Sequence, residues 1–276
     1  MSTSLRSPNT QELILLKKWR TNAFWVCLIG YIGYYLCRKN LSAAFPLMEE
    51  VFGYTNSQLG LIAFYSELAY AAGKFINGPL ADKLGGKKIF LTGMVGAMVC
   101  NIAFSFGESL PYFIVVWCLC RYFLSMGWGA LVKIIGHWYE PERNGTIMGF
   151  ISLNFQFGGV IATLFAGLLV AQGVGWKGIF IYPPMVLFLI FIWSYFACKE
   201  SPRDVIPDTN FGHGEGDKQA IVTKEEGEEK LKAHPIKIVK GLLSLPIFRQ
   251  VLIFSFFTTF LRSIFFFWTP KLLVDL

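Results

Sequence analysis

The sequence has 276 residues, of which 54% are hydrophobic and 17% aromatic, while only 16% are charged. Soluble domains carry about 25% charged residues, so this composition indicates a membrane protein. The formal net charge of +7 could suggest a nucleic-acid-binding protein. The cations are instead spread over short connections between apolar runs and form no basic face, which excludes that class. We therefore expect a lipid bilayer around the protein and no nucleic acid as a partner.

The apolar runs predict an all-α membrane protein. A bilayer core about 30 Å thick requires roughly 20 helical residues for each crossing. Many glycines and alanines within the runs favour close packing of neighbouring helices in lipid. Seven segments fit this description: 22–47, 57–80, 88–107, 111–138, 144–172, 177–198 and 246–274.

The lysines and arginines of the connecting segments predict the orientation. They concentrate before the first span, between the second and third spans, and after the sixth, whereas the opposite side carries only Lys177 and Lys271. We therefore expect the N-terminus in the cytoplasm, and no cleaved signal peptide, because its short apolar core and cleavage site are missing. The predicted parts are a cytoplasmic segment 1–21, a six-helix bundle 22–198, a charged cytoplasmic linker 199–245 and a seventh helix in 246–276.

Away from the ends of the predicted spans, six cations fall inside them, namely Arg38, Lys39, Lys74, Arg121, Lys133 and Arg262, with Arg249 near an entrance. The spans contain one acid, Glu67. A cation at the bilayer centre costs about 2.5–3.5 kcal/mol, and intramembrane charges usually line a pathway or site. One carboxylate cannot neutralise six cations, which predicts a cavity that receives an anion or water. For Lys39, Arg121 and Lys133, pairing with helix carbonyls or with Glu67 is an equally good explanation.

Two of these cations occupy the same sequence frame. Arg38 precedes Pro46 by eight residues and Arg262 precedes Pro270 by eight, and each arginine follows a phenylalanine by 14. A duplicated transporter shows such an echo, because corresponding helices of its two halves face one site near the midplane of the membrane. The echo therefore predicts that Arg38 and Arg262 contribute to one anion site.

The link "GPLADKLGGKK" between the second and third spans carries a Gly, an Asp-basic pair, a second Gly and two basic residues. This pattern resembles the corresponding loop of the major facilitator superfamily. An aspartate at a helix end can bind nearby helix termini and cations, and such contacts would hold one face of a transporter closed. The expected gating residues are Gly78, Asp82, Lys83, Gly85, Lys87 and Lys88.

Within that superfamily the chain resembles the organophosphate:phosphate antiporters, which include glycerol-3-phosphate and hexose-phosphate transporters. The stretches that carry the resemblance are "YYLCRKNLSAAFP", "AYAAGKFINGPLAD", "GWGALVKIIGHWYEPERNG" and "FLRSIFFFWTPKLL". The resemblance covers nearly the whole chain. It implies a fold of twelve helices in two halves, of which this chain supplies the N-terminal six-helix bundle and the first helix of the second half.

The resemblance also assigns a substrate site. Phosphate binding falls on two arginines, and the full expected set is Arg38, Arg262, Lys39, Lys74, Tyr35 and Tyr70. Two positions depart from the family pattern: Phe155 stands where the family has a histidine, and Glu67 lies where the family is usually uncharged. Glu67 is therefore a candidate proton or counter-charge site.

Three functions follow from these residues. The first is exchange of an organic phosphate for inorganic phosphate by alternating access; the second is a membrane sensor of hexose phosphate; the third is a proton-coupled transporter of organic carboxylates. An enzyme is not expected, because no Ser-His-Asp or metal-ligand spacing surrounds a site, and the six cysteines read as buried thiols in apolar runs. We expect no metal or other cofactor, a monomer when full length, and a bacterial inner membrane as the location.

Overall fold

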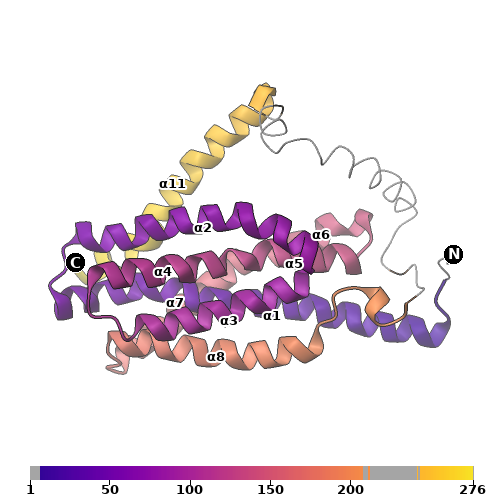
Figure 1. Ribbon diagram of the computed structural model, residues 1–276, viewed down its shortest axis with the longest axis horizontal. Helices are drawn as coiled ribbons and strands as arrows, with labels where there is room; N and C mark the ends of the chain where they lie inside the picture. The colour runs from indigo at the N-terminus through magenta and orange to yellow at the C-terminus, as the bar shows by residue number, and fades with distance from the viewer. Residues whose placement is uncertain (1–6, 208–210, 212–240, 242, 276) are drawn as a thin grey trace. The chain divides into compact units, whose positions relative to one another are not determined.

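The computed structural model describes residues 7–207, 211, 241 and 243–275, which fall into two units, 1–213 and 214–276. The described residues are helical, without a strand. The first unit contains α1 (Thr10–Phe52), α2 (Asn56–Leu84), α3 (Gly86–Phe104), α4 (Leu110–Leu124), α5 (Met126–Trp138), α6 (Pro141–Ser152), α7 (Asn154–Ala171), α8 (Trp176–Ala197) and the short 3-10 helix η1 (Pro202–Asp204), and the second contains α11 (Pro246–Asp275) (Figure 1). Most of the predicted linker 199–245 lies outside the described residues.

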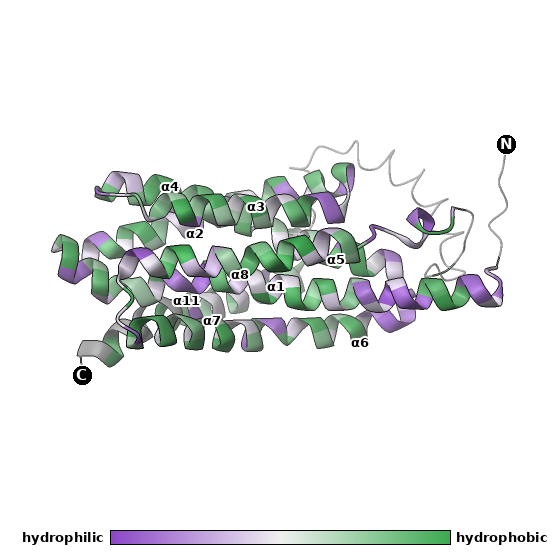
Figure 2. Cartoon of the chain, turned by 90° about the horizontal axis from the view of Figure 1, so that it is seen from below, coloured by the Kyte–Doolittle hydropathy of each residue, from purple (hydrophilic) through white to green (hydrophobic). Residues whose placement is uncertain are grey.

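Six helical stretches of the described chain are long and apolar enough to cross a membrane: Asn56–Leu84, Gly86–Phe104, Leu110–Trp138, Pro141–Ala171, Trp176–Ala197 and Pro246–Phe265. They agree with six of the seven predicted spans. The first predicted span lies within α1, which is not among them, because Arg38, Lys39 and Asn40 lower the hydropathy of its apolar run. Figure 2 shows hydrophobic residues along much of α3, α4 and α8, and alternating hydrophilic and hydrophobic turns at the N-terminal end of α1.

Two predicted spans prove to be pairs of helices. A turn at Ser125 separates α4 from α5, and a turn at Leu153 separates α6 from α7. The Ser125 hydroxyl donates to the carbonyl of Tyr122 at 2.7 Å and accepts a bond from the Asn77 side chain at 2.7 Å. These bonds satisfy polar groups at the turn, which lets the backbone bend within an apolar segment.

The first unit packs α1 against α7 and α8, α2 against α4, and α3 against α4, α5 and α8. Small residues allow the close approach that the sequence predicts: a Cβ added at Gly158 of α7 would lie 2.8 Å from the ring of Tyr35 on α1. A buried amide pair also joins α1 to α3, because Asn40 Nδ2 donates to Asn101 Oδ1 at 2.5 Å. Paired amides inside an apolar core fix the register of two helices.

One end of the bundle gathers the connections that the sequence places in the cytoplasm. Arg20 on α1 forms a salt bridge of 3.0 Å with Glu140, which lies between α5 and α6. The indole of Trp138 donates to the carbonyl of Lys199 at 3.1 Å. The segments that meet here are the start of α1, the connection from α5 to α6, and the chain after α8. The basic residues predict a cytoplasmic position for all three.

A cluster of aromatic rings lies at the other end of the bundle. The Phe52 ring at the end of α1 lies 5.4 Å from Phe113 of α4 and 5.3 Å from Trp176 of α8, between centroids. Aromatic side chains concentrate at membrane–water interfaces, where one edge of the ring is wet and the other is apolar. This cluster fits the interface opposite the basic connections.

Candidate functional site: cations around Tyr70

Two predicted substrate residues, Arg38 of α1 and Lys74 of α2, meet at the ring of Tyr70, which is buried. Three cations surround this ring: Arg38 Cζ lies 4.8 Å, Lys74 Nζ 5.0 Å and Arg121 Cζ 4.6 Å from its centroid. A cation over an aromatic face is stabilised by about 0.5–1 kcal/mol at exposed sites and by about 2 kcal/mol when desolvated. The attraction of each cation to the Tyr70 ring therefore offsets part of the repulsion among the three positive charges.

Glu67 lies on the same face of α2 as Tyr70 and Lys74, since residues three and seven apart share a helix face. Its carboxylate accepts a hydrogen bond from Arg121 and forms a salt bridge with it. The Arg121 side chain is 1% exposed and the Glu67 side chain 36% exposed. Of the two explanations open for Arg121, pairing with Glu67 is the one the structure shows.

The four charged groups at Tyr70 do not balance. Arg38, Lys74 and Arg121 are cations and Glu67 is a carboxylate, which gives the group a formal charge of +2. Because these residues come from α1, α2 and α4, the helix packing itself creates the excess. Such a site favours a ligand that carries negative charge.

Arg38 extends the cluster toward α1. Its Nη1 lies 3.5 Å from the Tyr70 hydroxyl oxygen, at the limit of a hydrogen bond, and its Cζ lies 5.6 Å from the centroid of the Tyr35 ring. Tyr35 is buried. The structure thus brings together four of the six predicted substrate residues, which are Arg38, Tyr35, Tyr70 and Lys74.

Lys39, which is also a predicted substrate residue, lies outside this cluster. Lys39 is half-buried and directed to α7, with its Cε 3.9 Å from the position of a Cβ at Gly159. Arg262 belongs to the second unit, on α11. The approach of Arg262 to Arg38 across a shared site stays a prediction.

A row of contacting aromatic rings adjoins the Tyr70 cluster. Its members are Tyr35, Tyr31, Trp128 and Phe155. The Tyr31 ring lies 5.7 Å from that of Tyr35 and 6.2 Å from that of Phe155, and Phe155 lies 4.8 Å from Trp128. Phe155 stands out in the sequence as a departure from the family pattern, whereas Tyr31 and Trp128 were not predicted as site residues. The sequence could have indicated Tyr31, because Tyr31, Tyr35 and Arg38 are spaced by four and three residues and so share one helix face.

The predicted gating loop contacts α5. Lys133 donates to the carbonyl of Ala81 at 2.9 Å and lies 3.2 Å from Asp82 Oδ1. A cation beside the last carbonyls of a helix is stabilised by the helix dipole. Ala81 and Asp82 both lie in the last turns of α2. For Lys133, pairing with a carbonyl and a carboxylate of this helix is therefore the explanation that holds. The Asp82 side chain is 79% exposed, so this salt bridge contributes at most about 1 kcal/mol.

The stronger contacts of this region join α3 to α8. The carboxylate of Glu200 accepts bonds from the backbone N–H of Gly86 at 2.6 Å and of Lys87 at 2.5 Å. In return, Lys87 Nζ donates to the carbonyls of Tyr195 at 2.9 Å and Cys198 at 2.7 Å. An anion thus caps the start of α3 and a cation caps the end of α8, as both helix dipoles favour. Lys87 is one of the predicted gating residues, whereas Glu200 was not predicted to contribute.

The remaining gating residues have simpler positions. Gly85 joins α2 to α3 with φ +93, a conformation that other residues rarely adopt. Lys83 and Lys88 are exposed, and nothing lies within 4 Å of a Cβ placed at Gly78. The loop geometry therefore explains Gly85, Lys87 and Asp82, while nothing in the described structure explains Gly78.

The fold and the cluster define a multi-pass membrane protein with a cationic interior. The chain belongs to the Major Facilitator Superfamily, whose family model matches residues 27–276. This result confirms the fold class expected from the sequence, the N-terminal bundle and the first helix of a second half.

Relatives support the narrower resemblance. The chain is 27% identical to a probable hexose phosphate transport protein of Chlamydia pneumoniae, covering 80% of this chain and 50% of that protein. It is 28% identical to the glycerol-3-phosphate transporter of Bacillus subtilis, covering 68% of this chain and 43% of the relative. It is 27% identical to the membrane sensor protein UhpC of Salmonella typhimurium, over 64% of this chain and 42% of the sensor. The chain spans about half the length of the curated relatives it matches.

Solved structures share the fold. A bacterial homologue of the human lysosomal transporter Spinster, in an inward-facing and unoccupied conformation, superposes with a TM-score of 0.61 at 18% identity. That match covers 68% of this chain and 44% of the homologue. The peptide transporter POT, as an E310Q mutant in complex with sulfate, gives a TM-score of 0.58 at 14% identity, over 81% and 46% of the two chains.

Proposed function

We propose that this chain belongs to a secondary transporter that exchanges an organic phosphate for inorganic phosphate by alternating access. The observation that carries the proposal is the gathering of three cations, Arg38, Lys74 and Arg121, around Tyr70 beside the single carboxylate that the described residues place there, that of Glu67. The relatives that transport hexose phosphate or glycerol-3-phosphate support a sugar phosphate or glycerol-3-phosphate as the organic substrate. An enzyme is not proposed, because the superfamily and these relatives are transporters by name.

The chemistry of the cluster suits a phosphate group. The guanidinium of Arg38 presents a planar fork to two phosphate oxygens, and Lys74 adds a flexible point charge. A phosphate dianion would offset the formal charge of +2. In the complete site we place Arg262 opposite Arg38, as the echo of the two sequence frames predicts.

Exchange follows from the same electrostatics. Without an anion, the cations at Tyr70 repel one another, so a state that brings them together is disfavoured. Any ligand with a phosphate group relieves the repulsion and gains affinity for that state, which is what a ligand-driven shift requires. Inorganic phosphate and an organic phosphate share this group. Either ligand can therefore favour the conformational change that opens the site to the other side of the membrane.

The orientation and the parts of the chain are also proposals. We place residues 1–21 and 199–245 in the cytoplasm, the bundle 22–198 and the helix of 246–276 in the membrane, and the protein in a bacterial inner membrane as a monomer. The salt bridge of Arg20 with Glu140 supports the first placement, because it joins two segments predicted for the same side.

The loop at Asp82 is proposed to hold one face of the transporter closed. Its bond to Lys133 and the caps that join α3 to α8 support this role, because they tie together four helices at the proposed cytoplasmic end.

The test is uptake into vesicles that contain the full-length protein. Vesicles loaded with inorganic phosphate should accumulate labelled glycerol-3-phosphate or hexose 6-phosphate, and empty vesicles should not. Uptake of a labelled organic carboxylate into phosphate-free vesicles, driven by a pH gradient, would instead support proton-coupled carboxylate transport with Glu67 as the proton site. The salt bridge of Glu67 with Arg121 favours a counter-charge role.

A membrane sensor of hexose phosphate is the second candidate, favoured by the similarity to UhpC. A sensor and a transporter can share one binding site. Saturable binding of hexose 6-phosphate without uptake, measured on the same preparation, would identify the sensor. Binding together with phosphate-dependent uptake would identify the transporter.

A further inference from the structure

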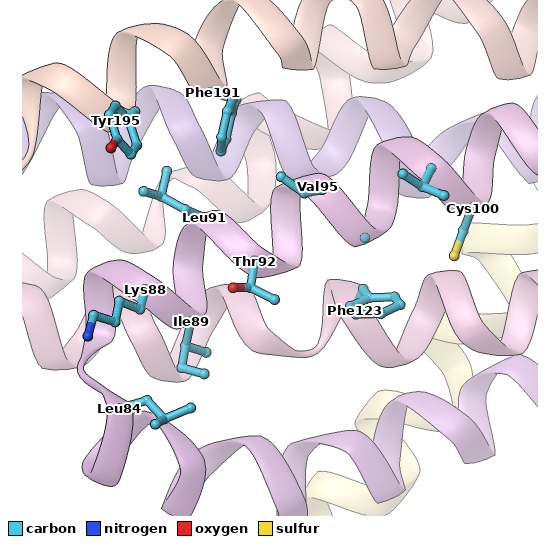
Figure 3. A pocket seen from close by; sticks show the side chains of 12 residues that line it. Leu84, Lys88, Ile89, Leu91, Thr92, Val95, Cys100, Phe123, Phe191 and Tyr195 are labelled. Atoms are coloured by element: carbon cyan, nitrogen blue, oxygen red, sulfur yellow. The ribbon is translucent and has the colours of Figure 1, made fainter.

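An apolar groove of about 720 Å³ runs along the outside of α3, between this helix, α8, α4 and the end of α2. Leu91 and Val95 of α3 line the groove, with Phe191 of α8 on one side and Phe123 of α4 on the other (Figure 3). Val99 of α3 is also a lining residue. Its volume lies within the range of about 300–1,000 Å³ that small-molecule sites occupy. None of these residues belongs to the Tyr70 cluster.

The groove lies on a surface of the bundle that faces the lipid hydrocarbon in a bilayer. Val95 is 40% exposed and Val99 61% exposed, so the groove is open along its length. The helices α3 and α8 are each long and apolar enough to cross a membrane. In a bilayer, the medium that contacts these valines is the hydrocarbon of lipid tails, and a groove of this shape accepts a chain rather than a compact solute.

A single cation stands at one end of the groove. Lys88 and the hydroxyl-bearing Tyr195 lie at this end, and Cys100 lies at the other (Figure 3). Lys88 is exposed, and no salt bridge is found for it among the described residues. Its neighbour Lys87, by contrast, is engaged by the last carbonyls of α8.

We propose that the groove binds an anionic phospholipid, with one acyl chain along Leu91, Val95 and Val99 and the headgroup phosphate at Lys88. Basic pockets between membrane helices on the cytoplasmic side bind anionic headgroups, and Lys88 lies on the side proposed as cytoplasmic. The lipid would bridge α3 and α8 beside the caps formed by Lys87 and Glu200. This site is independent of the substrate proposed for the Tyr70 cluster.

The experiment reconstitutes the protein in equimolar phosphatidylglycerol and phosphatidylcholine with identical acyl chains, and counts the retained lipids by native mass spectrometry. The parent should retain an excess of phosphatidylglycerol. Lys88→Gln should lower the ratio of the two lipids about fivefold, since one basic residue near the surface contributes about 1 kcal/mol. Lys177→Gln, an exposed lysine at the opposite end of the bundle, is the matched control and should leave the ratio unchanged.

A second variant tests the acyl-chain site. Val95→Trp places a ring in the groove at a partly exposed position, and should reduce retention of both lipids while helicity and thermal unfolding stay as in the parent. Millimolar inorganic phosphate should not displace phosphatidylglycerol. The proposal is overturned by an unchanged lipid ratio in Lys88→Gln, by an equal fall in Lys177→Gln, by full retention in Val95→Trp, or by displacement with free phosphate.

Discussion

Two regions of the bundle use the same kinds of charged residue to opposite effect. At the junction of α3 and α8, Glu200 binds the first N–H groups of α3 and Lys87 binds carbonyls at the end of α8, so a helix terminus stabilises each of these two charges. At Tyr70, three cations share one carboxylate, that of Glu67, and one aromatic ring. Balanced charges stabilise a structure, whereas an excess of one sign provides a site for a ligand of the other.

The largest effect is a loss of stability, and we expect it where one charge of the Tyr70 cluster loses its partner. Glu67→Gln leaves Arg121 buried without its carboxylate, and we expect the free energy of unfolding to fall by about 3 kcal/mol. This value is at the low end for a broken buried pair, because Glu67 is partly exposed. Chemical denaturation in detergent measures the change.

Two further variants show whether the pair is responsible. Glu108→Gln removes an exposed carboxylate and should change the stability by less than about 0.5 kcal/mol. Arg121→Gln combined with Glu67→Gln should recover part of the loss, because neither charge then remains unpaired. Equal stabilities of the Glu67 and Glu108 variants would show that the pair contributes nothing.

The second prediction concerns ligand binding at Arg38. Arg38→Lys keeps the positive charge but loses the planar fork, so the affinity for inorganic phosphate should weaken by about 1.5–3 kcal/mol, the usual contribution of a hydrogen bond to a charged group. Isothermal titration of the purified protein measures the affinity. Lys133→Gln, which removes a cation that caps α2, should leave the affinity within a factor of about two. An Arg38→Lys protein with the parent affinity would exclude Arg38 from the site.

The third prediction concerns the balanced region. Glu200→Ala removes the acceptor of two backbone N–H groups at the start of α3, and should lower the free energy of unfolding by about 1–2 kcal/mol, as loss of a helix cap does. Phosphate affinity should not change, because this junction is not part of the Tyr70 cluster. A large loss of affinity with unchanged stability would reverse the roles assigned to the two regions.

The sequence predicted much of the fold, because hydropathy and length are local properties that decide whether a segment can cross a bilayer. The shared helix face of Glu67, Tyr70 and Lys74 follows from their spacing of three and four residues, because helical periodicity is fixed. The sequence did not predict the turns at Ser125 and Leu153, because no proline or charge marks them.

Contacts between distant segments were the hardest to predict. The bond of Glu200 to Lys87 joins residues 113 positions apart, and the sequence placed Glu200 in a flexible linker. Likewise, the burial of Arg121 against Glu67 depends on the packing of α2 on α4. The sequence could therefore identify the charged residues of the site, but only their packing distinguishes those with a matched partner from those in excess.

The smallest effect is expected at the salt bridge of Arg20 with Glu140. Burial raises the pKa of the Glu140 carboxyl, but a backbone hydrogen bond and the Arg20 guanidinium outweigh it and hold this pKa below its usual value. A lowered pKa in the folded state stabilises the protein above the ordinary glutamate pKa of about 4.3, and this stabilisation is lost as the pH falls through the folded-state pKa. The parent should exceed Glu140→Gln by less than about 1 kcal/mol at pH 7, since both partners are partly exposed. The difference should shrink when unfolding is measured at increasingly acidic pH below that ordinary value; a difference that grows with acidity would show that Glu140 is not stabilised in its charged form.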